Sequence, residues 1–321
     1  MNVVITGAGG FLGRILTRRL CAAWPDPTHR LLLIDHAPAA GYEDSRVAWL
    51  TGDFGRVTGV DAALAECDVV IHLAAVPGGA AEKDYELAKR VNLDQTLELI
   101  EKTAAGPRRR RFIYASTIAV FGEPLPEAID DATLPRPTLT YGAHKLMIEI
   151  ALENLTRLGR IDALALRFPG LLARPAGGSG MRSAFMSELF HACAAARPFV
   201  VPTRREATVW AMSASRAADN LIHAARMAPP GKGARRAFTL PALRTSMGDL
   251  AAAVARSTRC DPGLISFARD EALEAQFGRL PPLAAPYAEA LGFSPDRDLD
   301  ELVARALADA GYALTVEEEH R

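Results

Sequence analysis

A glycine-rich turn near the N-terminus constrains the fold of this chain more than any other feature of its sequence. The stretch TGAGGFLG, residues 6–13, follows the apolar run VVIT and precedes an amphipathic helical pattern from Phe11 to Ala23. Its glycines Gly7, Gly10 and Gly13 have the spacing GxxGxxG. Glycine at such a junction permits a tight turn and a close approach of strand, helix and a bound phosphate group. A purely structural turn would use the same glycines, but their place between a strand and a helix favours a nucleotide site.

Short apolar runs alternate with longer helical patterns through the first half of the chain. Beyond the first strand and helix, strands are predicted at 31–35, 47–53, 68–75, 111–116 and 162–168, and helices at 57–66, 82–104 and 141–158. The strands are apolar almost throughout instead of alternating, so helices should cover both faces of their sheet. This pattern predicts an α/β fold with a doubly wound parallel sheet, the Rossmann arrangement.

After Phe168 the pattern changes. The segment 169–183, PGLLARPAGGSGMRS, is rich in glycine, proline and arginine and predicts a functional loop. A strand at 207–212, a helix at 213–227 and a strand at 237–241 are expected to return to the first half. We therefore expect an NAD-binding domain over 1–168 and about 206–241, and a smaller, mostly helical substrate-binding lobe over 169–205 and 242–321.

The composition is that of an ordinary globular protein. The chain is 49% hydrophobic and 23% charged with a formal net charge of −1, so it offers no electrostatic attraction to nucleic acid or membrane. It begins directly with a strand, and no apolar run approaches the ~18 residues of a membrane span, so we expect neither a signal peptide nor a membrane segment. Its four cysteines are far apart and no cluster has metal-ligand spacing. These features predict a cytoplasmic protein with reduced thiols and no metal.

The glycine turn should hold the pyrophosphate of a dinucleotide. The backbone amides of Phe11 and Leu12 would face its oxygens from the positive end of their helix. Asp35 closes the second predicted strand, where a carboxylate accepts hydrogen bonds from the adenosine ribose and repels a 2′-phosphate. NAD is therefore expected rather than NADP, although a strand-end aspartate can also simply cap a turn. Asp53, after the third strand, is a candidate for the adenine amino group and is ambiguous alone.

The stretch TYGAHK places Tyr141 and Lys145 one turn apart on one face of a helix. A free tyrosine, with a pKa of about 10, is a poor base near neutral pH. A nearby ammonium favours the phenolate and lowers that pKa. Residues 116–122, STIAVFG, end the preceding strand at the carboxyl edge of the sheet, where ligands of such folds bind. The pair thus predicts a proton acceptor there, although the spacing alone occurs by chance in many helices.

In their order along the chain, these motifs resemble the extended short-chain dehydrogenase/reductase family. The matching segments are the glycine turn, HLAA at 72–75, VNLDQT at 91–96, STIAVFG at 116–122 and the YxxxK of Tyr141 and Lys145. The resemblance covers nearly the whole chain. It implies an NAD-dependent enzyme in which Thr117, Tyr141 and Lys145 are catalytic, Thr117 holds the substrate oxygen and Lys145 also holds the nicotinamide ribose.

The same resemblance implies further cofactor contacts. Asn92 would position the lysine through water, and Pro169 with Gly170 would cover the nicotinamide. The remaining expected cofactor residues are Phe54, Leu73, Ala74 and Ala75. The family commonly forms homodimers through the helices at 82–104 and 141–158. The stretches LDQTLELI and LMIEIALENL contain enough apolar positions for a second buried face, which core packing alone could also explain.

Four longer segments resemble a subgroup of this family that oxidises the C2 hydroxyl of a four-carbon sugar acid with NAD. They are residues 116–145, 167–175, 209–225 and 287–303. The first candidate substrate is then D-erythronate, oxidised to 2-oxo-D-erythronate. A carboxylate beside C2 needs a cationic partner, because an unpaired buried charge is costly. Arg174 is the first candidate, since a guanidinium binds a carboxylate through two parallel hydrogen bonds; Arg182 and Arg205 are weaker ones, and Arg174 could instead only pin its own loop.

Two other functions stay open on the same fold. No single residue excludes a nucleotide-sugar epimerase. The 4,6-dehydratase branch is disfavoured because Ile118 and Ala119 stand where those enzymes carry an Asp-Glu pair. A non-catalytic NAD-sensing protein is disfavoured because such relatives usually lack the tyrosine or the lysine, and this chain has both.

Overall fold

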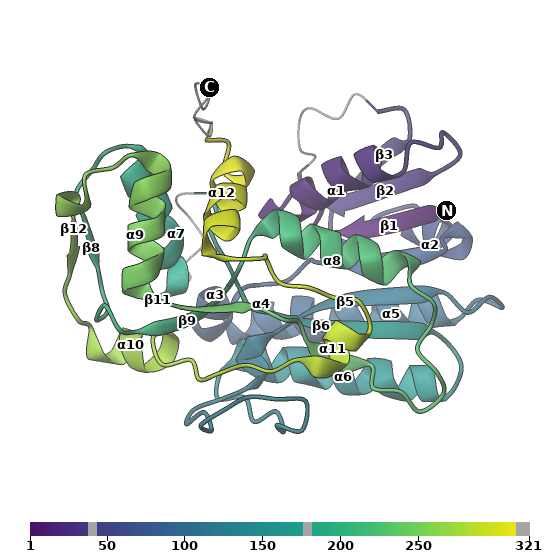
Figure 1. Cartoon of the computed structure of the whole chain (residues 1–321). Coiled ribbons are helices and arrows are strands. Elements are labelled where there is room, and N and C mark those ends of the chain that lie inside the picture. The colour runs from purple at the N-terminus through teal and green to yellow at the C-terminus, as the bar shows by residue number, and fades with distance from the viewer. Residues whose placement is uncertain (38–43, 176–181, 313–321) are drawn as a thin grey trace.

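A seven-stranded sheet forms the centre of the larger half of the protein (Figure 1). The computed structural model describes residues 1–37, 44–175 and 182–312. Every pairing in this sheet is parallel, and the order reverses beside the first strand. Such a reversal is the switch point at which doubly wound sheets bind ligands, so the predicted fold class is confirmed. In spatial order the strands are β3 (Val47–Thr51), β2 (Arg30–Asp35), β1 (Asn2–Thr6), β4 (Val69–His72), β5 (Arg111–Thr117), β6 (Asp162–Phe168) and β10 (Ala237–Thr239).

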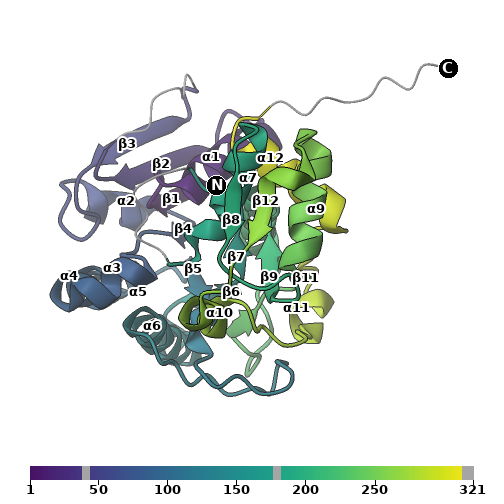
Figure 2. The ribbon, with the colours of Figure 1, turned by 90° about the vertical axis from the view of Figure 1, so that its left-hand side faces the viewer.

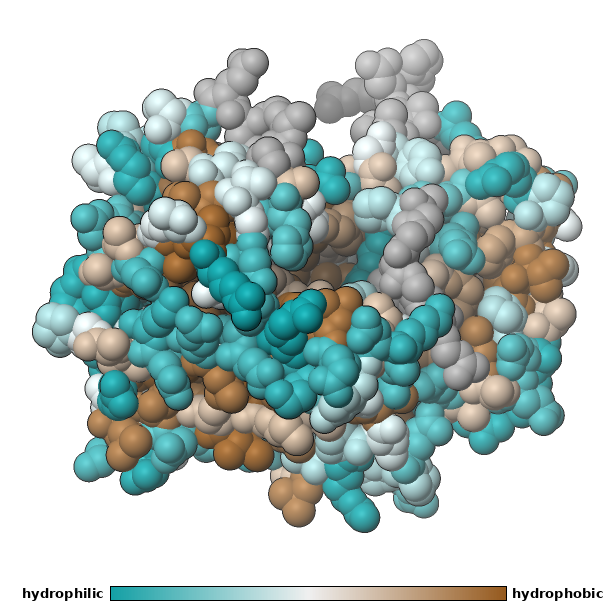
Figure 3. Space-filling view, turned by 180° about the vertical axis from the view of Figure 1, so that it is seen from behind, coloured by the Kyte–Doolittle hydropathy of each residue, from teal (hydrophilic) through white to brown (hydrophobic). Residues whose placement is uncertain are grey.

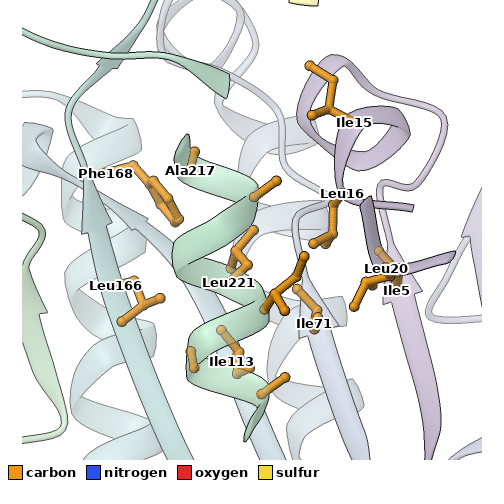
Figure 4. Close-up of a cluster of buried hydrophobic side chains, with 14 of the residues drawn as sticks. Ile5, Ile15, Leu16, Leu20, Ile71, Ile113, Leu166, Phe168, Ala217 and Leu221 are labelled. Carbon is orange, nitrogen blue, oxygen red and sulfur yellow. The ribbon is translucent and has the colours of Figure 1, made fainter. Parts of the chain in front are cut away.

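Helices bury both faces of this sheet, as its apolar strands require. Figure 4 shows Leu16 and Leu20 of one helix and Leu221 of another gathered over Ile71 and Ile113 of the sheet. Every residue of β4 and β6 is buried, which explains why these strands lack an alternating pattern. One face is covered by α1 (Phe11–Ala23) and α8 (Ala214–Arg226), and the other by α2 (Val60–Glu66), α5 (Thr96–Ala104) and α6 (Thr140–Arg157).

The long helix expected over 82–104 is wrong as a single element. The chain instead forms α3 (Gly78–Lys83), α4 (Tyr85–Lys89), a π-helical turn (Arg90–Gln95) and then α5. Asp84 breaks the helix because its non-helical backbone lets its carboxylate cap α4, accepting from Leu87 N at 2.9 Å. A π turn is a frequent local feature of functional sites. Here it carries Asn92, whose side chain is buried.

The smaller part of the protein has its own hydrophobic core and stands beside one end of the main sheet (Figure 2). It is mostly helical, as expected. Two small sheets contribute β7 (Gly170–Leu171), β9 (Thr208–Met212) and β11 (Leu243–Ser246), and β8 (Phe199–Val201) with β12 (Ile265–Phe267). The helices of this part are α7 (Phe185–Ala194), α9 (Met247–Thr258), α10 (Glu271–Phe277) and α12 (Leu299–Asp309), with 3-10 turns at Arg182–Ala184 and Pro262–Leu264. The remaining helix, α11 (Pro286–Ala290), packs against β10 and the core of the main sheet, and a further 3-10 turn, Ile118–Val120, follows β5.

The strand expected at 207–212 does not join the main sheet. It forms β9, which pairs antiparallel with β11 and parallel with β7. The other two returning elements are confirmed, because α8 packs against α1 and β10 extends the main sheet beside β6. A strand pattern specifies an extended segment but not its partner, so only tertiary packing could place β9.

Among the described residues, no helix is long and apolar enough to cross a bilayer. Within the same ranges, no three His, Cys, Asp or Glu side chains gather as metal ligands would. All four cysteines are free thiols.

Candidate active site

The glycine turn between β1 and α1 tolerates no side chain at two of its positions. Gly7 has a φ of 70°, and a Cβ there would lie 2.6 Å from the backbone nitrogen of Ala74. A Cβ at Gly13 would collide with the carbonyl oxygen of Gly7. Gly10 is the N-cap of α1, and no side chain caps that helix. The first-turn amides, including those of Phe11 and Leu12, therefore remain available to an anion at this end of the helix.

Asp35 lies at the end of β2 against the same turn. One of its carboxylate oxygens accepts from Gly9 N at 2.9 Å and the other from His36 N at 2.7 Å. A Cβ at Gly9 would lie 3.1 Å from this carboxylate, so the turn and the aspartate fit closely. Each carboxylate oxygen can accept more than one hydrogen bond, which leaves capacity for the hydroxyls of a ribose.

Asp35→Ala should weaken NAD binding and relax the preference for NAD over NADP. The substitution removes the acceptor for the ribose hydroxyls and the negative charge that repels a 2′-phosphate. The measurement is kcat/KM with each cofactor for both proteins. Asp44→Ala is a suitable control, because this carboxylate pairs with Arg46 at 2.6 Å. Comparable efficiency of the unmodified protein with both cofactors would contradict the assignment of Asp35.

The structure places the other expected nucleotide contacts in two different settings. Leu73, Ala74 and Ala75 follow β4 and are half-buried beside the glycine turn. Asp53 is engaged internally, accepting from Gly55 N at 3.0 Å and from Gln95 Nε2 at 2.6 Å. The ring of Phe54 lies in the core, edge-on to His72 with 5.0 Å between ring centroids. Phe54 can therefore reach a cofactor only through its backbone.

Asn92 holds the backbone that follows β4. Its Nδ2 donates to Val76 O at 3.0 Å and its Oδ1 accepts from Val76 N at 2.8 Å. Val76 precedes Pro77 and Gly78, which line the cavity described below. Both polar atoms of Asn92 are thus used to fix this wall of the site, a role that the sequence pattern did not predict.

Thr117, Tyr141 and Lys145 come together where β5 ends and α6 begins. A Cβ at Gly142 would collide with Ala119 O, so glycine lets α6 approach the turn after β5. Thr117 Oγ1 accepts from Ala119 N at 3.1 Å, which leaves its hydroxyl proton for a ligand. Lys145 Nζ lies 5.5 Å from the centroid of the Tyr141 ring and donates to Ala115 O at 2.7 Å.

The electrostatics of the pair differ from the expectation that Lys145 lowers the pKa of Tyr141. Burial raises the pKa of Tyr141, and the cation that opposes this rise is Arg174. Burial also lowers the pKa of Lys145 to about 7, with Glu149 acting in the opposite direction. The lysine is therefore only partly charged near neutral pH, and Arg174 acts on the phenol instead.

A buried ion pair beneath Lys145 was not anticipated from the sequence. Glu149 lies one turn after Lys145 on α6 and is 3% exposed, so its charge needs partners. It pairs with Arg167 at 2.7 Å and accepts a hydrogen bond from the hydroxyl of Ser116. The spacing of Lys145 and Glu149 in KLMIE is the sequence signal that could have revealed it.

A cavity of about 260 Å³ joins these residues to the smaller part of the protein. Thr117, Tyr141, Pro169 and Arg174 all line it. Arg174 Nε donates to Leu171 O at 3.2 Å, which keeps the guanidinium close to its own loop. Most of the other walls are apolar, from side chains that include Ile118, Phe121, Leu125, Met186, Val209, Trp210, Phe277 and Leu280.

The weaker arginine candidates are not brought to this cavity. The guanidinium of Arg205 lies 4.6 Å from the centroid of the Phe267 ring and lines a separate depression beside α9. The side chain of Arg182 lies outside the described residues.

The backbone of Arg174 is held by His191, a residue that the sequence analysis did not predict. His191 donates from Nε2 to Arg174 O at 2.5 Å, and its Nδ1 lies 2.8 Å from the Tyr312 hydroxyl. This pair anchors the backbone of Arg174 to the end of the described chain.

The site combines a dinucleotide turn at the switch point of a parallel sheet with a tyrosine–lysine pair and a small cavity. These features define a nucleotide-dependent oxidoreductase. The sequence profile of the NAD dependent epimerase/dehydratase family matches residues 3–229. The chain belongs to this family, and NAD is its cofactor.

Individual similar proteins indicate which class of reaction the protein catalyses. D-erythronate dehydrogenase of Cupriavidus necator is 32% identical over 98% of this chain and 100% of its own length. D-erythronate dehydrogenase of Haemophilus influenzae is 34% identical over 71% of this chain and 73% of its own. A crystal structure of a nucleoside-diphosphate-sugar epimerase from Agrobacterium tumefaciens superposes with a TM-score of 0.85, 29% identity, and coverage of 98% and 96%. The protein is an NAD-dependent oxidoreductase that acts on a CH–OH group.

Proposed function

We propose that this protein oxidises the C2 hydroxyl of a short sugar acid with NAD, and that D-erythronate is its substrate and 2-oxo-D-erythronate its product. The observation that carries the proposal is the convergence of Thr117, Tyr141 and Arg174 on one small cavity. A proton acceptor, an oxygen-holding hydroxyl and a cation are the groups that oxidation of a 2-hydroxy acid needs.

The chemistry assigned to these residues follows from their positions. NAD supplies the hydride acceptor when bound. The Thr117 hydroxyl donates to the substrate oxygen, and Tyr141 takes the proton from that oxygen as the C2–H bond breaks. The product is a 2-oxo acid, with the hydride on the cofactor and the proton on the tyrosine. Lys145 would hold the nicotinamide ribose, and Pro169 with Gly170 would cover the nicotinamide.

The charge and size of the cavity favour a small acid as substrate. Arg174 is a cation in a mainly apolar cavity, where an anionic ligand gains most from pairing. The volume of about 260 Å³ lies below the range of roughly 300–1,000 Å³ usual for drug-sized ligands. A four-carbon acid suits this space better than a nucleotide sugar, and the relatives named D-erythronate dehydrogenase support this substrate.

A substrate screen with an arginine variant tests the proposal. The protein should reduce NAD with D-erythronate far faster than with nucleotide sugars, as followed by NADH absorbance. Arg174→Ala should raise the KM for the acid by about tenfold or more, while the KM for NAD changes little, because charged hydrogen bonds contribute about 1.5–3 kcal/mol. Arg205→Ala, in the separate depression, is the matched control and should change neither constant. Absence of turnover with every short sugar acid would refute the substrate.

A nucleotide-sugar epimerase is the second candidate. It is favoured by the likeness to the Agrobacterium structure, which bears the name of such an epimerase. Epimerases of this fold retain NAD tightly, whereas dehydrogenases must exchange it. NAD that co-purifies in stoichiometric amount, together with turnover of a nucleotide sugar and none of D-erythronate, would favour this second function.

The protein is also proposed to be a homodimer that pairs α5 and α6 with their copies. Met147 and Ile150 of α6 are 54% and 61% exposed, and Leu97 of α5 is 36% exposed. Hydrophobic residues gather along the lower edge of the rear face in Figure 3, the edge along which α6 runs in Figure 1. Exposed apolar side chains at helical spacing are suited to a second buried face.

Ile150→Asp should convert the dimer to a monomer, because it would bury an unpaired carboxylate on each side of the interface. Sedimentation at micromolar concentration measures the change. Val200→Asp, which alters a residue 54% exposed on β8 in the smaller part of the protein, serves as a control and should leave the dimer intact. A monomer in the unmodified protein would refute the dimer.

A further inference from the structure

The wall that α10 contributes to the cavity contains a polar group without an internal partner. Gln276 lies near the end of α10 and lines the cavity together with its neighbour Phe277. Its side-chain Oε1 is buried and makes no hydrogen bond. Native proteins leave few buried polar atoms unpaired, because each such atom has lost water without gaining a partner. Oε1 is closed to solvent in the substrate-free protein, so the carboxamide must turn about its last side-chain bond to present this oxygen to a ligand, and the absence of an internal partner for Oε1 leaves it free to do so.

Two of the other polar side chains around the cavity are already engaged. Glu82 accepts from Thr140 N at 2.6 Å, and Trp210 Nε1 donates to Pro281 O at 2.7 Å. Other buried unpaired side-chain atoms of the described residues belong to side chains that do not line the cavity: Trp24 Nε1, Gln95 Oε1, Arg110 Nε, His144 Nδ1 and Arg216 Nε. Gln276 is thus distinguished by being both unpaired and on the cavity wall.

We infer that the carboxamide of Gln276 binds a substrate hydroxyl distal to C2, and so selects polyhydroxy acids over simple 2-hydroxy acids. This inference rests on the proposed function and adds the recognition of the rest of the substrate to it. Thr117 and Tyr141 enter from β5 and α6, whereas Gln276 enters from α10 in the smaller part of the protein. A substrate with its C2 at Tyr141 extends its remaining carbons into the space that α10 bounds.

A hydroxyl is the natural partner of this amide. A carboxamide can accept through its oxygen or donate through its NH₂ group, and a hydroxyl can do either in return. The match therefore holds for both orientations of the amide. Sites that hydrogen-bond a substrate hydroxyl reject analogues without it, because the polar group of the protein is then left buried and unpaired.

This role is tested by comparing the unmodified protein and a Gln276 variant on the same set of substrates. The substrates are D-erythronate and the analogues of the same C2 configuration that lack the hydroxyl at C3 or at C4. The unmodified protein should lose about tenfold in kcat/KM on removal of the hydroxyl that Gln276 binds. Gln276→Met keeps the length of the side chain without its amide. Its kcat/KM for D-erythronate and for the analogue without that hydroxyl should agree within about twofold, since the partner of the hydroxyl is gone.

Controls separate binding from structure. Because the amide has no internal hydrogen bond, Gln276→Met should leave the thermal stability of the substrate-free protein unchanged or slightly higher. Gln276→Leu provides the same test should the methionine variant misfold. Phe277→Leu changes the neighbouring wall but keeps the amide, so it should alter kcat/KM for all three acids by a similar factor.

Each outcome has a separate meaning. Turnover of D-erythronate with undiminished discrimination between the acids in both Gln276 variants overturns this inference and leaves the proposed function standing. Equal use of all three acids by the unmodified protein does the same. No turnover of any short sugar acid overturns the proposed function, and this inference with it.

Discussion

Tyr141→Phe should abolish turnover and leave NAD binding largely intact. The substitution removes the phenolic hydroxyl that takes the substrate proton and keeps the aromatic ring that lines the cavity. Loss of a general base typically reduces the rate by about 10²–10⁴-fold. NAD affinity, measured by fluorescence titration, should change by no more than about twofold, since little contact area is lost.

Tyr114→Phe is the matched control. Tyr114 is a buried tyrosine beside the same lysine, with its ring centroid 4.4 Å from Lys145 Nζ. Phenylalanine keeps that ring, so this variant should remain active. If Tyr141→Phe retained more than a few per cent of the activity, another group would have to be the base.

The pH profile of the unmodified protein provides an independent check on Tyr141. Burial raises the pKa of this phenol, and only the ionised form accepts a proton. The rate of oxidation at saturating NAD should therefore increase as the pH rises from neutral towards that pKa. Arg174→Ala removes the cation that opposes the rise in pKa, so the profile of that variant should move to higher pH.

Lys145→Met should abolish turnover and weaken NAD binding while making the cofactor-free protein more stable. The lysine is proposed to hold the nicotinamide ribose beside Tyr141, so its loss both weakens the cofactor and leaves the nicotinamide out of position for the reaction. Its pKa is lowered from 10.5 to about 7 in the folded protein because burial disfavours the charged form. Folding thus carries a cost in free energy whenever the ammonium is charged in the unfolded chain.

The sign of the pH dependence follows from these two pKa values. Between about pH 7 and 10.5 the unfolded chain binds more protons than the folded one, so the unfolding free energy increases with pH over this window. Lys145→Met removes that slope. The unfolding free energy of the variant should exceed that of the unmodified protein most at and below pH 7, by on the order of a few kcal/mol. The difference should disappear above about pH 10.5.

Denaturant unfolding at several pH values measures this effect. Lys89→Met is the control, because Lys89 is exposed and pairs with Asp94 at 2.7 Å on the surface. It should not reproduce the change of slope. Equal pH slopes in Lys145→Met and in the unmodified protein would contradict a strongly lowered pKa of Lys145.

Several features of this protein followed directly from its sequence because they depend on local rules. The alternation of strands and helices along the chain, and the bounds of α1, follow from apolar periodicity and from the glycine turn that joins the first strand to the first helix. Tyr141 and Lys145 share a helix, so their spacing alone places them on one face. The position of Asp35 beside the glycine turn was also predictable, because neighbouring parallel strands end at the same edge of their sheet.

Only the tertiary structure decided features that join distant segments. It placed β9 in a separate sheet, since an extended segment does not encode its own partner. It brought Arg174 and Gln276 into one cavity with Tyr141, across gaps that no periodic pattern spans. It also made Arg174 rather than Lys145 the cation acting on the Tyr141 phenol, because burial and through-space distance, which set a pKa, exist only after folding.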